Sequence, residues 1–525
     1  MLNITQGTLF ILCLLFLWVP TKKALLLYQQ NRYQMQRYDR SLKDELCYHK
    51  EHLENICALL GVYVLLFARK EDLPCLFIML LLMYVLVLWR KEDTTAYRKP
   101  LVYTHRVKRY LCICYVCYGL IVFYMLQIFQ LYLMILLFPF FYLLPWLLLI
   151  PLGIALLPLE KQIQSMYMKE AKQLLQQHQN LHIIGITGSY GKTSVKHILY
   201  QLIAQQYYTL MTPHSYNNKM GITLTIRKQL QSLHEVFLCE MGADHVHEIS
   251  ALMAFVKPSW SIVTAIGPQH LSTFQTMEHI VHEKMQAIEC LPKDGIGFLN
   301  IDNAWIREYP IQNTCRIVTY GTHAAADYRI KDIVYSKQGA SFKIHVKGVD
   351  YAFHTKLLGK HNVVNIAAGI AVAHCLGIEL SVLQELTKHL PYVEHRLQLR
   401  PTSSYTMLDD AYNSNVEGAT YALEVLAKME GKHIVVTPGF LDLGDMEENA
   451  HVRLGKQLTQ VADEVILVGQ HQSKHIVKGL QQAQYDSRHV YVCENIQEAF
   501  ELLKQLATKD SVVLFENDLP DAFNH

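Results

Sequence analysis

A glycine-rich turn followed by a lysine is the strongest chemical signal in the chain. The segment LHIIGITGSYGKTSVKHIL begins at position 181, and an apolar, β-branched run precedes its turn while a helical pattern follows it. Gly188 and Gly191 let backbone N–H groups face an anion, and Lys192 brings a positive charge to terminal phosphates at a helix N-terminus. The segment predicts a nucleoside triphosphate site, although Ile186 occupies the first glycine position of the strict GxxxxGK[ST] form.

Side chains suited to a nucleotide-bound metal accompany this turn. The hydroxyl of Thr193 or Ser194 can be placed on Mg²⁺. Glu240 ends an apolar run, where a carboxylate can reach the same ion. His270 follows another predicted strand, and Lys284 lies on the next predicted helix. Each of these three residues also has an alternative without a role in the site. Glu240 would be a surface carboxylate, His270 a loop histidine and Lys284 a solvated charge on a helix.

Alternating strands and helices must position these residues. Short, apolar, β-branched runs predict strands at 181–187, 235–240, 261–266, 434–438, 465–469, 489–493 and 511–515. Helical stretches between many of them are typical of parallel α/β sheets. More polar, alternating residues near 327–357 predict an antiparallel insertion, and 160–180 predicts a surface helix that links this part to what precedes it.

The part of the chain before residue 160 is more apolar than the rest. The 525 residues suggest two to four domains, and the net charge of +2 excludes a strongly electrostatic nucleic-acid binder. Charged residues make up 18%, below the ~25% of soluble domains, and the mean hydropathy is +0.11. The run from Tyr110 to Leu159 has no formally charged residue. The apolar excess therefore concentrates before residue 160.

Apolar runs of this kind predict a transmembrane region of about five helices over 1–159. The expected crossings are 7–27, 53–68, 73–89, 111–131 and 134–157. A buried core helix is the alternative for 53–68, which carries Glu54. Basic residues in the loops 28–52 and 90–109 place these loops in the cytoplasm, so the N-terminus is expected outside and everything after residue 160 inside. The 12 cysteines show no CxxC pair after residue 160, which favours reduced thiols.

Further segments resemble one enzyme family in their order along the chain. They are TPHSYNNKMGITLT from 212, VFLCEMGADHVHEI from 236, IVTAIGPQHLSTFQTMEHIVHEKMQ from 262, LNIDN at 299–303, LGKHNVVNIAAGIAVA at 358–373, HRLQL at 395–399, LDDAYNSNVEGATYALEVL at 408–426 and DLGDMEENAHVRLG at 442–455. Together with the glycine-rich turn they resemble the Mur ligases, the ATP-dependent amide ligases of peptidoglycan precursor synthesis. The resemblance is strongest to members that add a D-alanyl-D-alanine dipeptide, and it covers about 180–516.

The resemblance implies a central, P-loop ATP-binding domain over 181–395 and a Rossmann-like α/β domain over 396–525. It assigns residues to ATP and two Mg²⁺ ions as follows. Implied nucleotide contacts are Gly188, Ser189, Gly191, Lys192, Thr193, Ser194, Asn365, Arg396 and Asp410. Implied metal ligands are Thr193, Glu240, His270 and Lys284, the last matching a lysine that family members carbamylate. Implied substrate contacts are Asn217, Asn218, Asn413 and Asn415, and Lys192, His270 and Lys284 are the implied catalytic residues.

Two departures from the family pattern concern the substrates. The predicted membrane region stands where the family has a UDP-binding domain, and the final strand is followed by ENDLPDAF instead of a Lys-Gly-Ser-Arg-type segment. The resemblance implies a ligase that joins D-Ala-D-Ala or a related amine to a muramyl peptide through an acyl phosphate. The predicted membrane region places this ligase at the cell membrane and leaves open whether its substrate is UDP-linked or lipid-linked. A capsule-type polyglutamate or peptide synthase is the alternative enzyme. A nucleotide-driven transporter and a non-catalytic scaffold are alternatives of other classes.

Overall fold

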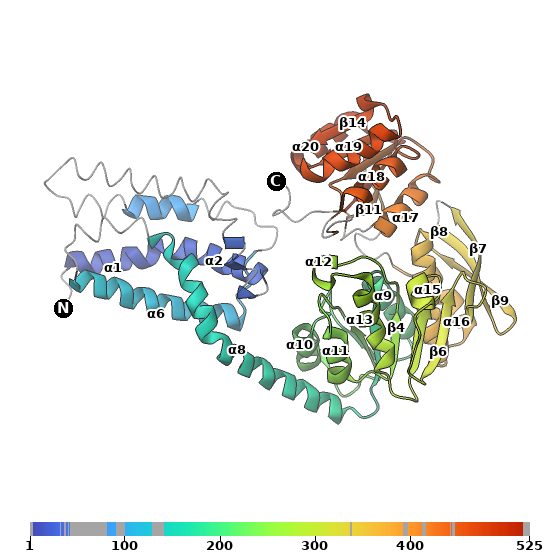
Figure 1. The fold of residues 1–525 in the computed structure, drawn as a ribbon, viewed down its shortest axis with the longest axis horizontal. Coiled ribbons are helices and arrows are strands. Elements are labelled where there is room, and N and C mark those ends of the chain that lie inside the picture. The colour runs from blue at the N-terminus through green and yellow to red at the C-terminus, as the bar shows by residue number, and fades with distance from the viewer. Residues whose placement is uncertain are drawn as a thin grey trace. The chain divides into compact units, whose positions relative to one another are not determined.

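The computed structural model divides the chain into two compact units, Met1–Ser165 and Met166–His525 (Figure 1). It describes residues 4–31, 33–35, 38–39, 41–42, 81–90, 100–128, 141–336, 339–391, 397–411, 416–440, 443 and 447–517. The two units are considered separately below.

Long apolar helices make up the described part of the first unit. They are α1 (Ile4–Phe16), α2 (Trp18–Gln30), α6 (His105–Ile128) and the first part of α8 (Leu144–Gln177), with a shorter helix at Leu81–Arg90. Three stretches, Gln6–Gln30, His105–Gln127 and Leu144–Gln177, are long and apolar enough to cross a membrane. The predicted crossing at 53–68, and parts of those at 73–89, 111–131 and 134–157, lie outside the described residues.

Helix α8 includes residues 160–177 of the predicted linker helix and begins earlier than the linker was expected to begin. It runs without interruption from Leu144 to Gln177, with Pro151 and Pro158 inside it. The expected start at 160 followed the first charged residue after the apolar run, Glu160, but a helix can continue from apolar into polar residues. The last part of the helix belongs to the second unit, where Ala171 is fully buried among the apolar side chains of that unit.

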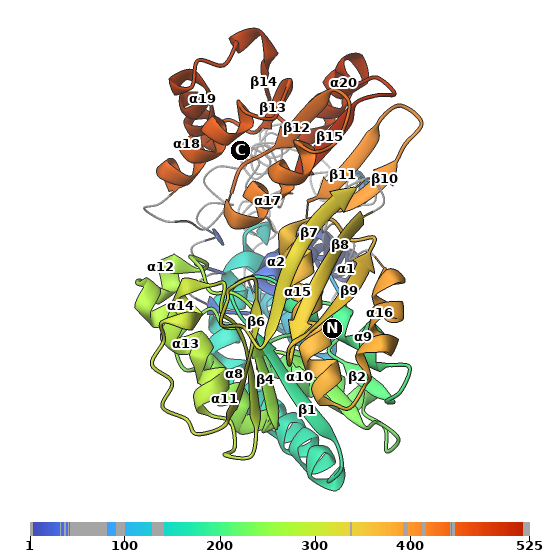
Figure 2. The same cartoon turned by 90° about the vertical axis from the view of Figure 1, so that its right-hand side faces the viewer.

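The second unit contains two sheets, and the first of them along the chain has nine strands. Its order is β2-β3-β1-β4-β5-β6-β7-β8-β9, parallel from β2 to β7 and antiparallel from β7 to β9. Figure 2 shows the long strands β7, β8 and β9 at one side of this sheet. The strands are β1 (His182–Thr187), β2 (Thr209–Met211), β3 (Val236–Glu240), β4 (Trp260–Val263), β5 (Ile296–Asn300), β6 (Arg316–Gly321), β7 (Tyr328–Ser336), β8 (Gly339–Val346) and β9 (Val349–Thr355). The predicted antiparallel insertion is thereby confirmed.

Helices connect and cover this sheet. They are α9 (Lys192–Ile203), α10 (Lys219–Gln229), α11 (Glu248–Val256), α12 (Leu271–Phe274), α13 (Met277–Glu289), α14 (Ala304–Arg307), α15 (Lys360–Cys375) and α16 (Leu380–Lys388). The predicted strand at 261–266 ends earlier, at Val263, because residues 264–268 turn toward the loop after β1.

A second, six-stranded sheet follows, in the order β10-β11-β15-β12-β13-β14. It is parallel except for the β10–β11 pair. Its strands are β10 (Gln398–Pro401), β11 (Thr406–Asp410), β12 (His433–Thr437), β13 (Glu464–Val468), β14 (Val490–Cys493) and β15 (Val512–Glu516). Its helices are α17 (Val416–Leu426), α18 (Glu447–Leu458), α19 (His471–Gln482), the short η2 (Ser487–His489) and α20 (Ile496–Leu506). The two mainly parallel sheets, with helices between their strands, agree with the predicted α/β class.

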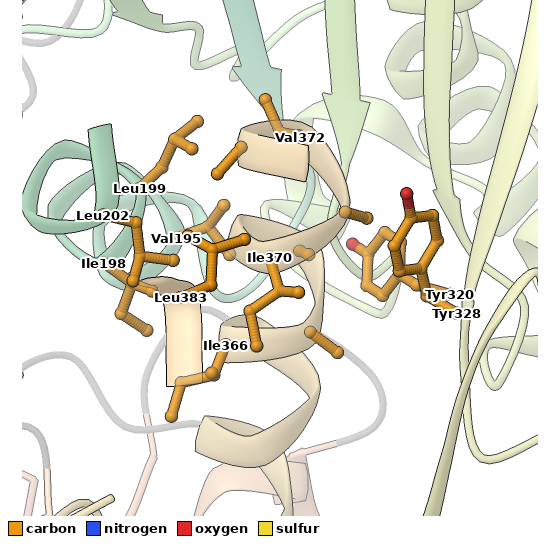
Figure 3. Packing of buried hydrophobic residues seen from close by; sticks show 14 of the residues in the cluster. Val195, Ile198, Leu199, Leu202, Tyr320, Tyr328, Ile366, Ile370, Val372 and Leu383 are labelled. Carbon is orange, nitrogen blue, oxygen red and sulfur yellow. The ribbon is translucent and has the colours of Figure 1, made fainter. Parts of the chain in front are cut away.

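The contact between α9 and α15 fixes the helix that begins at the glycine-rich turn. Figure 3 shows Val195, Ile198 and Leu202 of α9 facing α15. Their spacing of three and four residues makes one apolar face of α9. The opposing face of α15 is rich in alanine and carries Gly369, where an added Cβ would lie 3.0 Å from both Ile198 and Leu202. The small residues therefore let the two helices approach closely.

Candidate functional site

The glycine-rich turn lies at the carboxyl end of β1 and leads directly into α9. Gly188 has φ +145° and Gly191 has φ +80°, conformations that other residues rarely adopt. A Cβ on Gly188 would lie 2.2 Å from Thr264 Oγ1, and one on Gly191 would lie 2.9 Å from Asn365 Oδ1. Both glycines are thus required by the backbone and by close neighbours. The contact also brings Asn365, a predicted nucleotide ligand, against the turn.

Neighbouring backbone holds the turn in shape. The Ser189 hydroxyl donates to Gly267 O at 3.0 Å, and the Tyr190 hydroxyl donates to Pro268 O at 3.1 Å. The Thr264 hydroxyl donates to Tyr190 O. Ser189 therefore shapes the loop through its side chain, in addition to any contact that its backbone makes with a ligand.

Lys192 and Thr193 occupy the first turn of α9. The Lys192 ammonium donates to Gly188 O at 2.7 Å and to Ser189 O at 3.0 Å, so it lies directly over the turn. The Thr193 hydroxyl contacts both carboxylate oxygens of Glu240, at 3.2 and 3.1 Å. Ser194 is buried. Of the two hydroxyls that the sequence left open, Thr193 is the one that reaches Glu240.

Glu240 is the centre of a buried polar cluster at the end of β3. It is 1% exposed, and its carboxylate accepts from Thr193, from Lys196 Nζ at 2.9 Å and from Asn217 Nδ2 at 3.1 Å. The surface alternative for Glu240 is therefore wrong. Lys196 was not predicted as a site residue, and the signal was available as a lysine on the apolar face of a helix.

Of the four predicted substrate asparagines, the structure describes Asn217 and Asn218, which have different places. Asn217 reaches Glu240, whereas the Asn218 side chain accepts from Gly221 N at 2.8 Å and caps the start of α10. The cap is worth about 1 kcal/mol to the helix. Asn413, Asn415 and Arg396 lie outside the described residues.

Lys284 is buried on α13, so the solvated-charge alternative is wrong. Its ammonium donates to Ala243 O at 3.0 Å and lies over the Phe274 ring. Burial, reinforced by the nearby positive charge of Lys192, lowers the pKa of Lys284 to about 7. The lowered pKa favours the neutral amine of Lys284 over its charged form more than in an exposed lysine.

His270 lies close to Asp244, a residue that the sequence reasoning did not select. His270 Nε2 is 3.6 Å from Asp244 Oδ1, and the negative charge of Asp244 also acts on Lys284. The adjoining Glu283 is 1% exposed and accepts from His247 N and Ile249 N at the start of α11. Glu283 thus fixes the segment after β3, which carries Asp244.

Asp410, the predicted nucleotide contact of the second sheet, ends β11. It is 8% exposed, and its Oδ1 accepts from Leu397 N at 2.9 Å. Glu516 lies beside it in register at the end of β15. The carboxyl ends of parallel strands are the usual place for ligands in α/β sheets.

Comparison with known proteins gives two domain families for the second unit. The Mur ligase middle domain matches residues 186–373, and the Mur ligase glutamate ligase domain matches residues 395–516. Together these matches cover more than half of the chain.

Two relatives carry the name UDP-N-acetylmuramoyl-tripeptide–D-alanyl-D-alanine ligase. The protein of Bacillus subtilis is 32% identical over 52% of this chain and 59% of its own length. The protein of Escherichia coli is 28% identical over 55% of this chain and 64% of its own length. The chain therefore spans about three fifths of the length of these relatives.

Solved structures agree on the fold. MurF ligase from Thermotoga maritima, in complex with ADP, has a TM-score of 0.61 at 24% identity and covers 68% of this chain and 80% of its own. A pseudomurein peptide ligase type C from Methanothermus fervidus has a TM-score of 0.51 at 16% identity, covering 66% and 78%.

Proposed function

Because the chain belongs to the Mur ligase family, we propose that it is an ATP- and Mg²⁺-dependent ligase that joins a carboxylate to an amine through an acyl phosphate. The observation that carries the proposal is the cluster at the ends of β1 and β3, where the Thr193 hydroxyl meets the Glu240 carboxylate beside the Lys192 ammonium. A muramyl peptide as the carboxylate and D-Ala-D-Ala or a related amine as the acceptor follow from the named relatives.

The residues present fit a nucleotide-bound Mg²⁺. This ion prefers oxygen ligands and binds through one or two carboxylates together with substrate phosphates. Glu240 and Thr193 supply a carboxylate and a hydroxyl that already lie within 3.2 Å of each other. When bound, the ion would neutralise charge on the phosphates during transfer.

The reaction proceeds in two displacements that the site can support. An oxygen of the substrate carboxylate attacks the γ-phosphorus, the bond to the β–γ bridging oxygen breaks, and ADP leaves. The amine nitrogen then attacks the acyl carbon, the carbon–oxygen bond to phosphate breaks, inorganic phosphate leaves and the nitrogen loses a proton. Lys192 lies over the phosphate loop, where its charge stabilises the transferring phosphoryl group.

Lys284 is proposed to become carbamylated and to act with His270 at a second metal position. Carbamylation adds CO₂ to a neutral amine and replaces an ammonium by an anionic carbamate. Burial and the lowered pKa of Lys284 favour the neutral amine. Asp244, beside His270, adds a further oxygen donor to this position.

The first unit is proposed to be a multi-pass membrane region that keeps the ligase domains at the cytoplasmic surface. Three helices are long and apolar enough to cross a bilayer. Such a region would allow a lipid-linked muramyl peptide to be the substrate.

The deciding experiment incubates the purified full chain with Mg²⁺·ATP, UDP-linked muramyl tripeptide and D-Ala-D-Ala. Mass spectrometry should detect ADP, phosphate and a new amide in equal amounts. Lys192→Ala should abolish all three, while Lys228→Ala, which changes an exposed lysine of α10, should not. Release of AMP would contradict the acyl phosphate.

A further inference from the structure

Lys196 is a fully buried lysine that the proposed chemistry does not use. It lies on α9 one turn after Lys192, with 0% of its side chain exposed. Its ammonium forms an ion pair with Glu240 at 2.9 Å and donates to His214 O at 2.5 Å. One side chain therefore joins three parts of the fold: the helix after the phosphate loop, the end of β3, and the segment 212–218.

Stability alone does not account for a charge at this position. Removing two charges from water costs several kcal/mol per ion, and well-packed apolar residues often replace a buried ion pair without loss. The neighbouring positions Val195, Leu199 and Ile203 show that α9 readily buries apolar side chains here. The location of the pair, not its contribution to folding, is the informative feature.

The segment 212–218 is tied to Glu240 from its other side as well. Asn217 Nδ2 donates to Glu240 at 3.1 Å, and Asn217 O accepts from Gly242 N at 2.8 Å. Thr212 Oγ1 accepts from Glu240 N at 3.1 Å. His214 has φ +44°, so the segment is held in a conformation that is uncommon for a residue with a side chain. Contacts at Glu240 thus help to set the shape of this segment.

We propose that Lys196 is a positioning residue that couples the shape of the 212–218 segment to nucleotide binding in the phosphate loop. The inference rests on the proposed function, in which Thr193 and Glu240 hold the nucleotide-bound metal. A metal ion bound there would use oxygen lone pairs of Thr193 and Glu240 and would shift the Glu240 carboxylate. Lys196 and Asn217, which donate to this carboxylate, would follow the shift, and Lys196 would transmit it to His214 O.

Hydrogen exchange of the full-length protein tests this coupling directly. Backbone exchange in residues 212–218 is measured by mass spectrometry with and without a non-hydrolysable ATP analogue and Mg²⁺. In the natural chain, the analogue should slow exchange in this segment about fivefold. In Lys196→Met the analogue should still bind, as calorimetry reports, but should leave exchange in the segment unchanged. Lys228→Met, at an exposed lysine, should behave like the natural chain.

Two results would overturn the proposal: equal protection of the segment in Lys196→Met, or no response of the segment in the natural chain although the analogue binds. If Lys196→Met fails to fold, Lys196→Arg and Lys196→Gln replace it. Arg keeps the charge and should restore part of the protection, whereas Gln keeps a donor without charge and should not. Absence of any analogue binding to the natural chain would contradict the proposed function itself, so the two failures are distinguishable.

Discussion

Lys284 combines complete burial, a neighbouring lysine and a pKa lowered to about 7. Its amine is increasingly neutral as the pH rises above 7, and only the neutral amine adds CO₂. We expect ¹³C NMR with labelled bicarbonate to show one protein carbamate at pH 8 that fades by pH 6. Lys284→Ala should lack the signal and the ligase activity, and short carboxylic acids should restore part of the activity. Full activity of Lys284→Ala without added acid would remove Lys284 from the site.

Thr193 offers a test of the metal ligands. Thr193→Val keeps the shape but deletes the hydroxyl that contacts Glu240. Calorimetric affinity for ADP in the presence of Mg²⁺ should fall about tenfold, a loss of about 1.4 kcal/mol, because one oxygen donor is gone. Affinity measured in EDTA should be nearly unchanged. Thr314→Val, at an exposed position, is the control. An equal loss with and without Mg²⁺ would place Thr193 on the nucleotide instead.

At the scale of elements, the free energy of unfolding should depend strongly on side-chain volume at the α9–α15 contact. An added Cβ at Gly369 lies 3.0 Å from Ile198 and Leu202, so Gly369→Ala requires only a small shift and gains helix propensity. Gly369→Val adds two further methyl groups and should lower the free energy of unfolding by about 1–3 kcal/mol. Chemical denaturation measures both variants. A Val variant as stable as the Ala variant would show that the helices separate freely.

The elements also show how far the sequence could predict the fold. Strands β1, β3, β12, β13, β14 and β15 were predicted to within about two residues, because buried parallel strands are continuous apolar runs. Strands β2, β5, β6, β10 and β11 were not predicted. The three-residue β2 and the polar β10 carry no such pattern, whereas β5 is a buried apolar run that the pattern could have revealed. Asp244 was missed because its role depends on a contact with a distant segment, which no local spacing reveals, whereas Lys196 could have been noticed as a lysine on the apolar face of a helix.

At the scale of the whole molecule, the proposed membrane role of the first unit can be tested as an anchor against a substrate-presenting element. We expect a chain of residues 160–525 to retain turnover on a UDP-linked muramyl peptide and to lose it on the lipid-linked counterpart. The cut at 160 keeps the buried Ala171 of α8 in the second unit. Equal turnover by the full and shortened chains on both substrates would reduce the first unit to an anchor.

The closeness of α15 to the phosphate loop has a consequence for selection experiments. Asn365 lies against Gly191, and a turn further along the same helix Gly369 lies against α9. A larger side chain between α9 and α15 would therefore disturb the nucleotide site even if no residue of that site were changed. In a random library screened for nucleotide binding at two temperatures, heat-sensitive alleles should concentrate among the alanines and glycine of α15, although none of these residues is itself a predicted nucleotide contact.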